Sequence, residues 1–298
     1  MTLAGRLAWN AWPFELITNF PVQLLIVGAL SLLGSALLRA RVTIAIAALG
    51  LVLNGLVVFA TISTEVRPAR LGSPSIAIGH LNAQTRPVDV DRIGAYVRAA
   101  KLDVFVVLDP TQRDVPRLTA AAPTYRAYTT GSAPGIHTAF VRAVVLSRIP
   151  ATEVDHPVDR AFGASAVEFT LGGSLPTSVV VLGTDSPTTP ARAQHRDRAL
   201  DAAARWSRAH PERRIVMGDL NATPWSPSFQ RLLHHGKLFN SLDGFGLQVS
   251  WPESNVLLRI PIDHALLGPA LAATDRGTGP AFGSQHRSLH VTVVERQP

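Results

Sequence analysis

The chain has 298 residues, of which 47% are hydrophobic and only 16% are charged. This balance is too apolar for an average soluble domain, so membrane-spanning segments are expected. The absence of cysteine excludes disulfides and cysteine-ligated zinc. The net charge of +7 suits phosphate, nucleic acid or an anionic membrane surface as a partner, but an arginine-rich chain with no special partner has the same charge.

Two uncharged segments near the N-terminus predict a transmembrane hairpin. Residues 20–38 and 42–62 carry no charged side chain, and each is long enough to cross a bilayer as a helix. Trp9 and Trp12 precede the first segment, where aromatic residues of the membrane interface usually lie. The alternative is a buried hairpin in a soluble core, but uncharged runs of this length are rare there.

The arginines around this hairpin favour two opposite orientations. Arg39 and Arg41 lie in the short turn and favour a cytoplasmic turn, whereas Arg6, Arg67 and Arg70 favour cytoplasmic ends. The turn is closest to the bilayer, so we expect both termini outside. The C-terminal domain is then expected to face the periplasm or the exterior.

Residues 67–75 form a linker rich in Pro, Gly, Arg and Ser. It separates an N-terminal segment, residues 1–66, from a domain, residues 76–298. Short apolar runs alternate with helical stretches in this domain, which indicates stacked sheets with helices outside. Residues 91–100 and 196–210 are predicted to be amphipathic helices. The predicted strands lie at residues 76–78, 104–108, 143–146, 167–171, 179–182, 215–217, 262–267 and 290–294.

Polar side chains follow several of these apolar runs. In "IVMGDLN", Asp219 and Asn221 are two residues apart, which puts both side chains on one face of an extended chain. One such residue is usually a turn former or a helix cap. A set of carboxylates and amides suits Mg²⁺ or Mn²⁺ and phosphoryl transfer. The full set is Asn82, Asp109, Asp219, Asn221, Asp263 and His286.

The motifs that contain these residues, in this order, resemble the endonuclease/exonuclease/phosphatase superfamily, which has the DNase I-like fold. "GDLNATPWSP" resembles that family's "GDFNATPWS" signature, "IPIDHALL" its penultimate motif, and "GSQHRSLHV" its terminal "GSDHRP" motif. "VVLSRIP" and "GFGLQVSWP" resemble a bacterial subgroup with two N-terminal membrane helices. The resemblance covers residues 76–294 and implies an α+β fold. That fold is a four-layer α/β/β/α sandwich, preceded here by a two-helix transmembrane hairpin in the bacterial inner membrane.

The resemblance also implies a role for each matching residue. Asp219 would orient or activate the attacking water, Asp263 would hold His286, and His286 would contact the scissile phosphate. The implied catalytic residues are Asp219, Asn221, Asp263 and His286; the implied substrate-binding residues are Asn82, Asn221 and His286; the implied ligands of Mg²⁺ or Mn²⁺ are Asn82 and Asp109.

Three positions depart from the family pattern. Asp109 replaces a metal-binding Glu, Asp185 replaces the His of a "THP" motif, and Gln285 replaces the Asp before the terminal His. A carboxylate at position 185 would repel a phosphodiester, and a neutral amide at position 285 cannot strengthen metal binding.

Two functions therefore stay open. The first is a membrane-anchored, Mg²⁺- or Mn²⁺-dependent phosphoesterase that hydrolyses a phosphodiester or a phosphomonoester by in-line attack of water. The alternative is a degenerate family member that binds a phosphate-bearing ligand or a partner without efficient hydrolysis. The expected partners are a phosphate-containing molecule and the lipid bilayer, through residues 20–62. Nucleic acid is a possible partner but an unsupported one, because the arginines form no cluster interleaved with aromatics.

Overall fold

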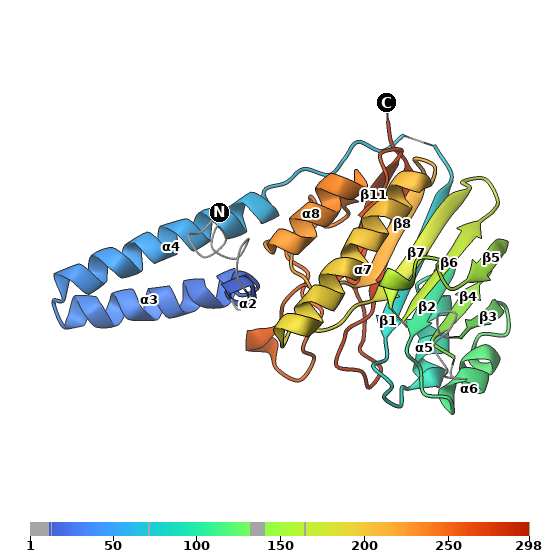
Figure 1. The fold of residues 1–298 in the computed structure, drawn as a ribbon, viewed down its shortest axis with the longest axis horizontal. Helices are drawn as coiled ribbons and strands as arrows, with labels where there is room; N and C mark the ends of the chain where they lie inside the picture. Colours follow the sequence, from blue (N-terminus) through green and yellow to red (C-terminus); the bar gives the residue numbers. More distant parts are fainter. Residues whose placement is uncertain (1–11, 13, 71, 132–140, 164, 298) are drawn as a thin grey trace.

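The computed structural model describes residues 12, 14–70, 72–131, 141–163 and 165–297. Two six-stranded sheets form its centre (Figure 1). The first sheet has the strand order β11–β12–β1–β2–β4–β3. Its strands are β1 (Ser75–Asn82), β2 (Val104–Leu108), β3 (Arg126–Thr130), β4 (Ala143–Ser147), β11 (Leu271–Thr278) and β12 (Leu289–Glu295).

The second sheet has the strand order β5–β6–β7–β8–β10–β9. Its central pair, β7 and β8, is parallel, and β8 pairs antiparallel with β10. The strands are β5 (Ala151–Asp155), β6 (Ala166–Leu171), β7 (Thr177–Gly183), β8 (Arg214–Asp219), β9 (Phe239–Asn240) and β10 (Asp263–Leu267).

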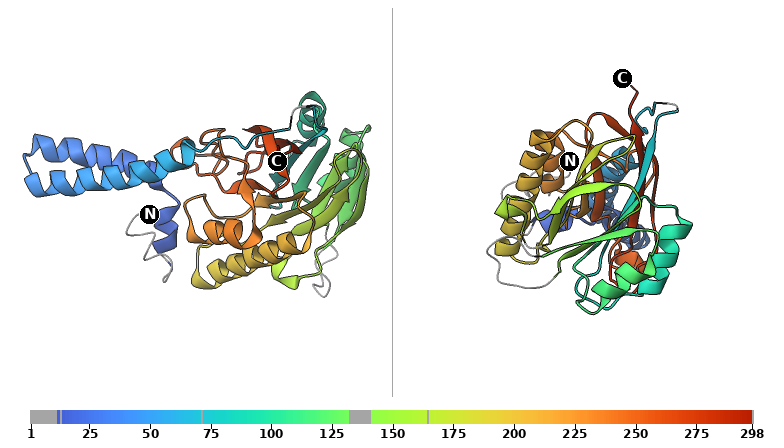
Figure 2. Two further views of the ribbon diagram at one scale, coloured as in Figure 1. Left: turned by 90° about the horizontal axis from the view of Figure 1, so that it is seen from above. Right: turned by 90° about the vertical axis from the view of Figure 1, so that its right-hand side faces the viewer.

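Three apolar layers hold the sheets and helices together. Alternate residues of the inner strands, such as Ile78, Val181 and Met217, pack between the two sheets. Helices α5 (Val90–Ala99) and α6 (Asp114–Ala121) cover the outer face of the first sheet, and α7 (Pro190–Ala209) and α8 (Pro227–Gly236) cover that of the second. Figure 2 shows these helices on opposite sides of the paired sheets. The predicted four-layer α/β/β/α sandwich is confirmed.

All eight predicted strands are present, and the four strands that the sequence did not indicate lie at the sheet edges. These are β3, β5, β9 and β11. An edge strand needs fewer apolar side chains, and β5 reads "ATEVD". Helix α7 begins at Pro190 and not at residue 196, because Thr189 accepts a capping hydrogen bond from the Arg192 amide, at 3.3 Å.

The N-terminal helices project from one side of the sandwich as a pair (Figures 1 and 2). Helix α3 (Pro21–Leu37) has 17 residues and α4 (Arg41–Ile62) has 22. At about 1.5 Å per residue they span about 25 and 33 Å, against about 30 Å for the apolar core of a bilayer. By length and composition, α4 is able to cross a membrane, and α3 is apolar but shorter.

The expected linker lies against the domain. Ala69 forms a bridge with Arg296, and the Arg70 amide donates to the Glu295 carbonyl at 2.9 Å. The Arg67 guanidinium stacks on the Phe239 ring, 3.5 Å from its centre. These contacts hold residues 67–70 against strands of both sheets, and the domain boundary itself stays a prediction.

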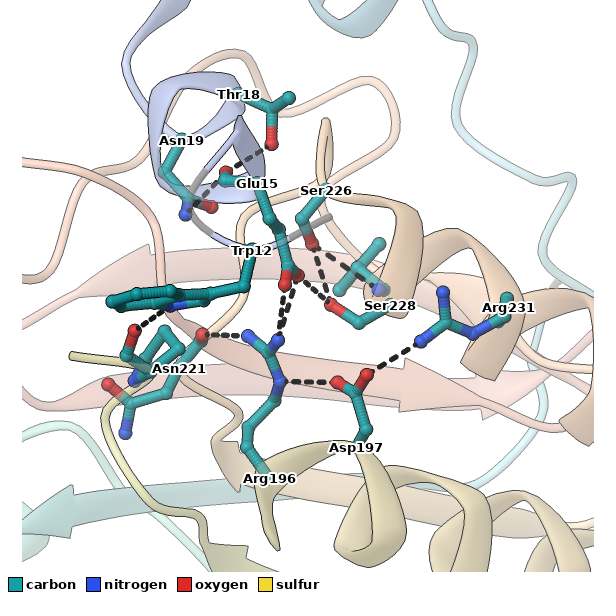
Figure 3. A network of polar contacts seen from close by, with 12 residues as sticks. Trp12, Glu15, Thr18, Asn19, Arg196, Asp197, Asn221, Ser226, Ser228 and Arg231 are labelled. Carbon is teal, nitrogen blue, oxygen red and sulfur yellow. Dashed lines mark hydrogen bonds and ion pairs between the residues drawn. The ribbon is translucent and has the colours of Figure 1, made fainter. Parts of the chain in front are cut away.

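A short helix before the hairpin, α2 (Phe14–Thr18), is fixed to the domain by a buried charge pair (Figure 3). Both oxygens of the Glu15 carboxylate accept hydrogen bonds from Nη2 of Arg196, at 2.8 and 2.7 Å, and Ser228 donates to the same carboxylate at 2.8 Å. The Arg196 side chain is 0% exposed and also donates to the Asn221 carbonyl, at 2.9 Å. The pair therefore links α2 to the "GDLN" motif.

Further polar contacts attach the base of the hairpin to the same region. Thr223 Oγ1 donates to Asn19 at 2.8 Å, and the Trp225 indole donates to Thr61 at 2.8 Å. Trp12, expected at the membrane interface, donates its indole N–H to the Pro187 carbonyl of the domain, at 2.9 Å. Trp9 lies outside the described residues. The hairpin is thus held at a fixed position beside the "GDLNATPW" loop.

Replacing Glu15 by Gln should lower the stability of the folded chain, because the buried Arg196 loses the charge of one of its two carboxylate partners and keeps only Asp197, at 2.7 Å. A hydrogen bond to a buried charged group contributes about 1.5–3 kcal/mol, and we expect a loss of this size. Thermal unfolding in detergent measures it. The matched control is Arg205→Gln, which breaks an exposed pair between the same helix and Asp159 (2.7 Å) and should change stability by about 0.5 kcal/mol or less. Equal effects would contradict a structural role for Glu15.

Candidate active site

The sheets bring polar side chains from three strands and one loop to the same end of the sandwich. Asn82 ends β1, Asp219 ends β8, and Asp263 begins β10. The antiparallel register of β8 and β10 puts Asp263 directly opposite Asp219. His286 arrives from the loop before β12, where Ser284 donates to the Asn82 carbonyl at 2.6 Å and accepts from the His286 amide at 3.0 Å.

These residues form one buried network around the His286 imidazole. Nδ1 of His286 lies 2.9 Å from Asp263 Oδ2, and Nε2 lies 3.5 Å from Asp219 Oδ2. The Asn82 amide donates to the same Asp219 oxygen at 2.9 Å. All four side chains are buried. The structure therefore brings together Asn82, Asp219, Asp263 and His286, which are more than 200 residues apart at the extremes.

The charges in this network depend on one another. Burial raises the pKa of Asp219 to about 6, although the nearby imidazolium opposes that rise. Burial also works against a charged His286, but the Asp263 and Asp219 carboxylates outweigh it and raise the pKa of His286 to about 9. Burial alone would raise the pKa of Asp263, but the favourable contact with His286 is stronger and lowers that pKa. The imidazole is therefore held as a cation between two acids.

The backbone of "GDLN" aims Asp219 and Asn221 in the same direction. Gly218 has a φ of 136°, and a side chain there would collide with the backbone of Leu182. Asn221 has a left-handed φ of 45°, which Asn tolerates better than most residues. Its amide group donates to the Thr184 carbonyl at 2.8 Å and to Asp219 Oδ2 at 3.2 Å. Both amide hydrogens of Asn221 are thus engaged, and one of them holds the Asp219 carboxylate in place.

Asp109 stands beside the network. Ser165 donates to one of its carboxylate oxygens at 2.6 Å, and Arg142 approaches the other at 3.4 Å. Asp109 and Asn82, the two predicted metal ligands, line the same cavity of about 430 Å³. The parallel pairing of β1 and β2 brings them there, since Asn82 lies level with Leu108.

The donors around this cavity fit a hard divalent cation. Asp109 offers a carboxylate oxygen, and Asn82 offers an amide oxygen that accepts from the Gln84 backbone at 2.9 Å. The Asp219 carboxylate does not line the cavity but accepts from Asn82 at 2.9 Å. Oxygen ligands of this kind are those that Mg²⁺ and Mn²⁺ prefer. The ligand atoms of Asp219, Asp263 and His286 also lie within 4.8 Å of one another. However, the His286 ring already lies between those two carboxylates, so the Asn82 and Asp109 side of the site suits a cation better.

Two basic side chains of α7 lie beside the Asp185 carboxylate. Asp185 lies 3.3 Å from Nδ1 of His195 and 4.0 Å from Nη2 of Arg192, both on α7. Asp185 and His195 line the same cavity as Asn82 and Asp109. A histidine of the neighbouring helix thus lies beside Asp185 in the lining of the cavity.

Several residues of the site were missed or undervalued on sequence. Nε2 of His80 lies 3.5 Å from Asp263, and burial lowers the pKa of His80 to about 4, which keeps it neutral. Its spacing of two residues from Asn82 on an extended strand was the available signal. The Gln84 amide lies 2.8 Å from Nε2 of His286. Ser165 and Arg142 gave no signal, because nothing in the sequence pairs them with Asp109.

One histidine of the motifs has a structural role instead. His264 is fully buried, and its Nε2–H donates to the Ala222 carbonyl at 2.8 Å. Its ring packs against Phe229, with the ring centres 4.5 Å apart. His264 therefore supports the "GDLNATPW" loop from beneath.

Comparisons with known proteins agree with this fold. The model of the endonuclease/exonuclease/phosphatase family matches residues 77–286. A protein of that family from Bacteroides thetaiotaomicron has a TM-score of 0.59 at 14% identity, over 74% of this chain and 98% of its own. A mannosyl-6-phosphatase from the same organism gives 0.58 at 14%, over 74% and 99%. TDP2 of D. rerio, complexed with a single-strand DNA product, gives 0.56 at 14%, over 74% and 98%.

At such identities the solved structures show the fold alone. A comparison with curated protein sequences gave no significant match. The family model covers more than half of the chain, and its match ends at His286, the last residue of the buried network. The chain belongs to the endonuclease/exonuclease/phosphatase family.

Proposed function

We propose that this protein is a membrane-anchored, divalent-cation-dependent phosphoesterase that hydrolyses a phosphodiester or a phosphomonoester by in-line attack of water. The observation that carries the proposal is the buried arrangement of Asn82, Asp219, His286 and Asp263. Similar structures include a mannosyl-6-phosphatase and a TDP2 bound to a DNA product, so phosphate-bearing substrates are compatible with the fold.

In this proposal, each side chain of the network has a distinct task. Asp219, fixed by the amides of Asn82 and Asn221, orients the attacking water and accepts its proton. His286, kept positive by Asp263, donates a hydrogen bond to an oxygen of the scissile phosphate and stabilises the charge that develops there. Asn221 was expected to donate to substrate oxygens, and that role requires its amide to leave Thr184.

Asp109 and Asn82 would hold the cation at the other side of the cavity. A bound Mg²⁺ or Mn²⁺ would supply Lewis-acid polarisation of the phosphoryl group and neutralise its charge. Asp109 is one methylene shorter than Glu, and Ser165 at 2.6 Å keeps its carboxylate aimed into the cavity.

The anchor in this proposal is the α3–α4 hairpin, since α4 has the length and composition of a membrane span. Arg39 and Arg41 in its turn favour a domain on the periplasmic or outer face of a bacterial inner membrane. The substrate is then a phosphate-bearing molecule available on that face. A phosphorylated lipid or sugar fits this location, and the arginines of the sequence form no cluster interleaved with aromatics that would favour nucleic acid.

A second function is favoured by one contact in the site. The Arg142 guanidinium lies 3.4 Å from the Asp109 carboxylate. Its positive charge therefore sits next to the carboxylate that a bound cation would need as a ligand. Together with Asp185 and Gln285, this contact suits a member that binds a phosphate-bearing ligand without efficient hydrolysis. Metal-dependent turnover by the wild-type chain excludes this alternative, and ligand binding without turnover supports it.

Replacing Asp219 by Asn, or His286 by Gln, should reduce turnover of bis-p-nitrophenyl phosphate or p-nitrophenyl phosphate by at least about 100-fold. A general base or a charged donor in the transition state contributes a factor of this size. The control is Asp275→Asn, an exposed acid on β11, which should retain wild-type turnover. Thermal unfolding of each variant checks the fold, and wild-type activity in folded Asp219→Asn would refute the proposed role.

Removal of divalent cations with a chelator should abolish turnover, and Mg²⁺ or Mn²⁺ should restore it. Asp109→Asn should raise the cation concentration needed for half-maximal activity by about 10- to 100-fold, because the site loses a charged ligand. A titration of activity against cation concentration measures this shift, with Asp275→Asn again as the control. An unchanged titration curve in Asp109→Asn would remove Asp109 from the cation site.

A further inference from the structure

An exposed apolar tip projects from the loop that borders the site. The one-turn helix η2 (Val256–Leu258) carries three adjacent apolar side chains that are 69%, 71% and 48% exposed. Exposed apolar side chains scattered singly are common, but three together at a loop tip indicate a contact surface. The tip carries no charged residue.

The tip lies at the base of the proposed membrane hairpin. The side-chain amide of Gln23, in the first turn of α3, donates to the Leu257 carbonyl at 3.1 Å and approaches the Arg259 carbonyl at 3.3 Å. In Figure 1 this orange-red segment lies near the domain end of α3. Because α3 spans about 25 Å, close to the thickness of the apolar core of a bilayer, its first turn would lie at the membrane surface.

The loop that presents the tip has a fixed shape. Trp251 and Ile260 exchange backbone hydrogen bonds of 3.2 and 2.6 Å at its neck. The Arg259 side chain donates to the carbonyls of Glu253 and Pro252, at 2.7 and 3.2 Å. Asn255 caps η2 by accepting from the Leu257 amide at 3.1 Å. The tip is therefore held outward by its own loop, with its apolar side chains away from the core.

We propose that Val256, Leu257 and Leu258 insert into the surface of the lipid bilayer, as a second membrane contact beside the hairpin. The inference rests on the proposed membrane anchor. A lipid surface is favoured over a protein partner because the tip is bonded to the first turn of a membrane helix. An apolar cavity of about 460 Å³, lined by Leu24, Leu56 and Trp225 among others, lies at the base of the same hairpin.

Insertion of the tip would fix the active site next to the membrane. The same loop begins with Ser250, whose hydroxyl accepts from the Asp263 amide at 3.2 Å. Its Trp251 ring lies 6.4 Å from the His286 ring. The two membrane contacts would therefore hold the network at a set height above the bilayer, where a substrate at the membrane surface can reach it.

The absence of cysteine allows a direct test in the full chain. Single cysteines at Leu257→Cys, Leu30→Cys and Val158→Cys are labelled with an environment-sensitive fluorophore. Each protein is then placed in vesicles of phosphatidylethanolamine and phosphatidylglycerol that contain lipids with a quencher on the acyl chain. Leu30 lies in the hairpin and is 65% exposed. Val158 is an exposed apolar residue of the domain (89%) next to Asp159, which pairs with Arg205 on α7.

The proposal predicts strong quenching at positions 30 and 257, with the signal at position 257 quenched several-fold more than that at position 158. Quenching at position 30 together with equal quenching at positions 257 and 158 would contradict insertion of the tip. It would leave the proposal that the hairpin is a membrane anchor intact. No quenching at position 30 would overturn the anchor and the tip with it. Thermal unfolding of each labelled protein verifies that the exposed substitution leaves the fold unchanged.

Discussion

The site depends on one imidazole held between two buried carboxylates. Asp219 and Asp263 lie opposite each other on paired strands, where two like charges would repel. His286 approaches both, at 3.5 and 2.9 Å, and its positive charge makes their burial tolerable. The position of the last loop, which carries His286, is thus tied to the register of β8 and β10. The same interaction between His286 and the two carboxylates therefore constrains both the fold and the site.

A second buried charge pair extends this constraint to the N-terminal helices. Arg196 receives the Glu15 carboxylate on one side and donates to the Asn221 carbonyl on the other. Asn221 in turn holds Asp219 through its amide. A continuous set of polar contacts therefore runs from the helix before the hairpin to the centre of the site. If the hairpin lies in a bilayer, the membrane and the reacting groups are fixed relative to each other by contacts of the protein itself.

Much of this arrangement could be predicted from the sequence. The rest could not be predicted, for physical reasons. Strand ends carrying Asn82, Asp219 and Asp263 were visible because buried central strands are continuous apolar runs. The edge strands β3 and β5 were not, because only part of each is buried. The pairing of Glu15 with Arg196 joins residues 181 positions apart, and no local pattern indicates such a contact. The substitution Asp185 looked purely unfavourable until the fold brought His195 beside it.

The buried network is proposed to direct water to phosphorus. Hydrolysis of p-nitrophenyl phosphate by the full chain in ¹⁸O-enriched water tests it most directly, with mass spectrometry of both products. The account predicts one ¹⁸O atom in the released phosphate and none in the nitrophenol. Label in the nitrophenol would place the attack on carbon, and it would contradict the roles given to Asp219 and His286.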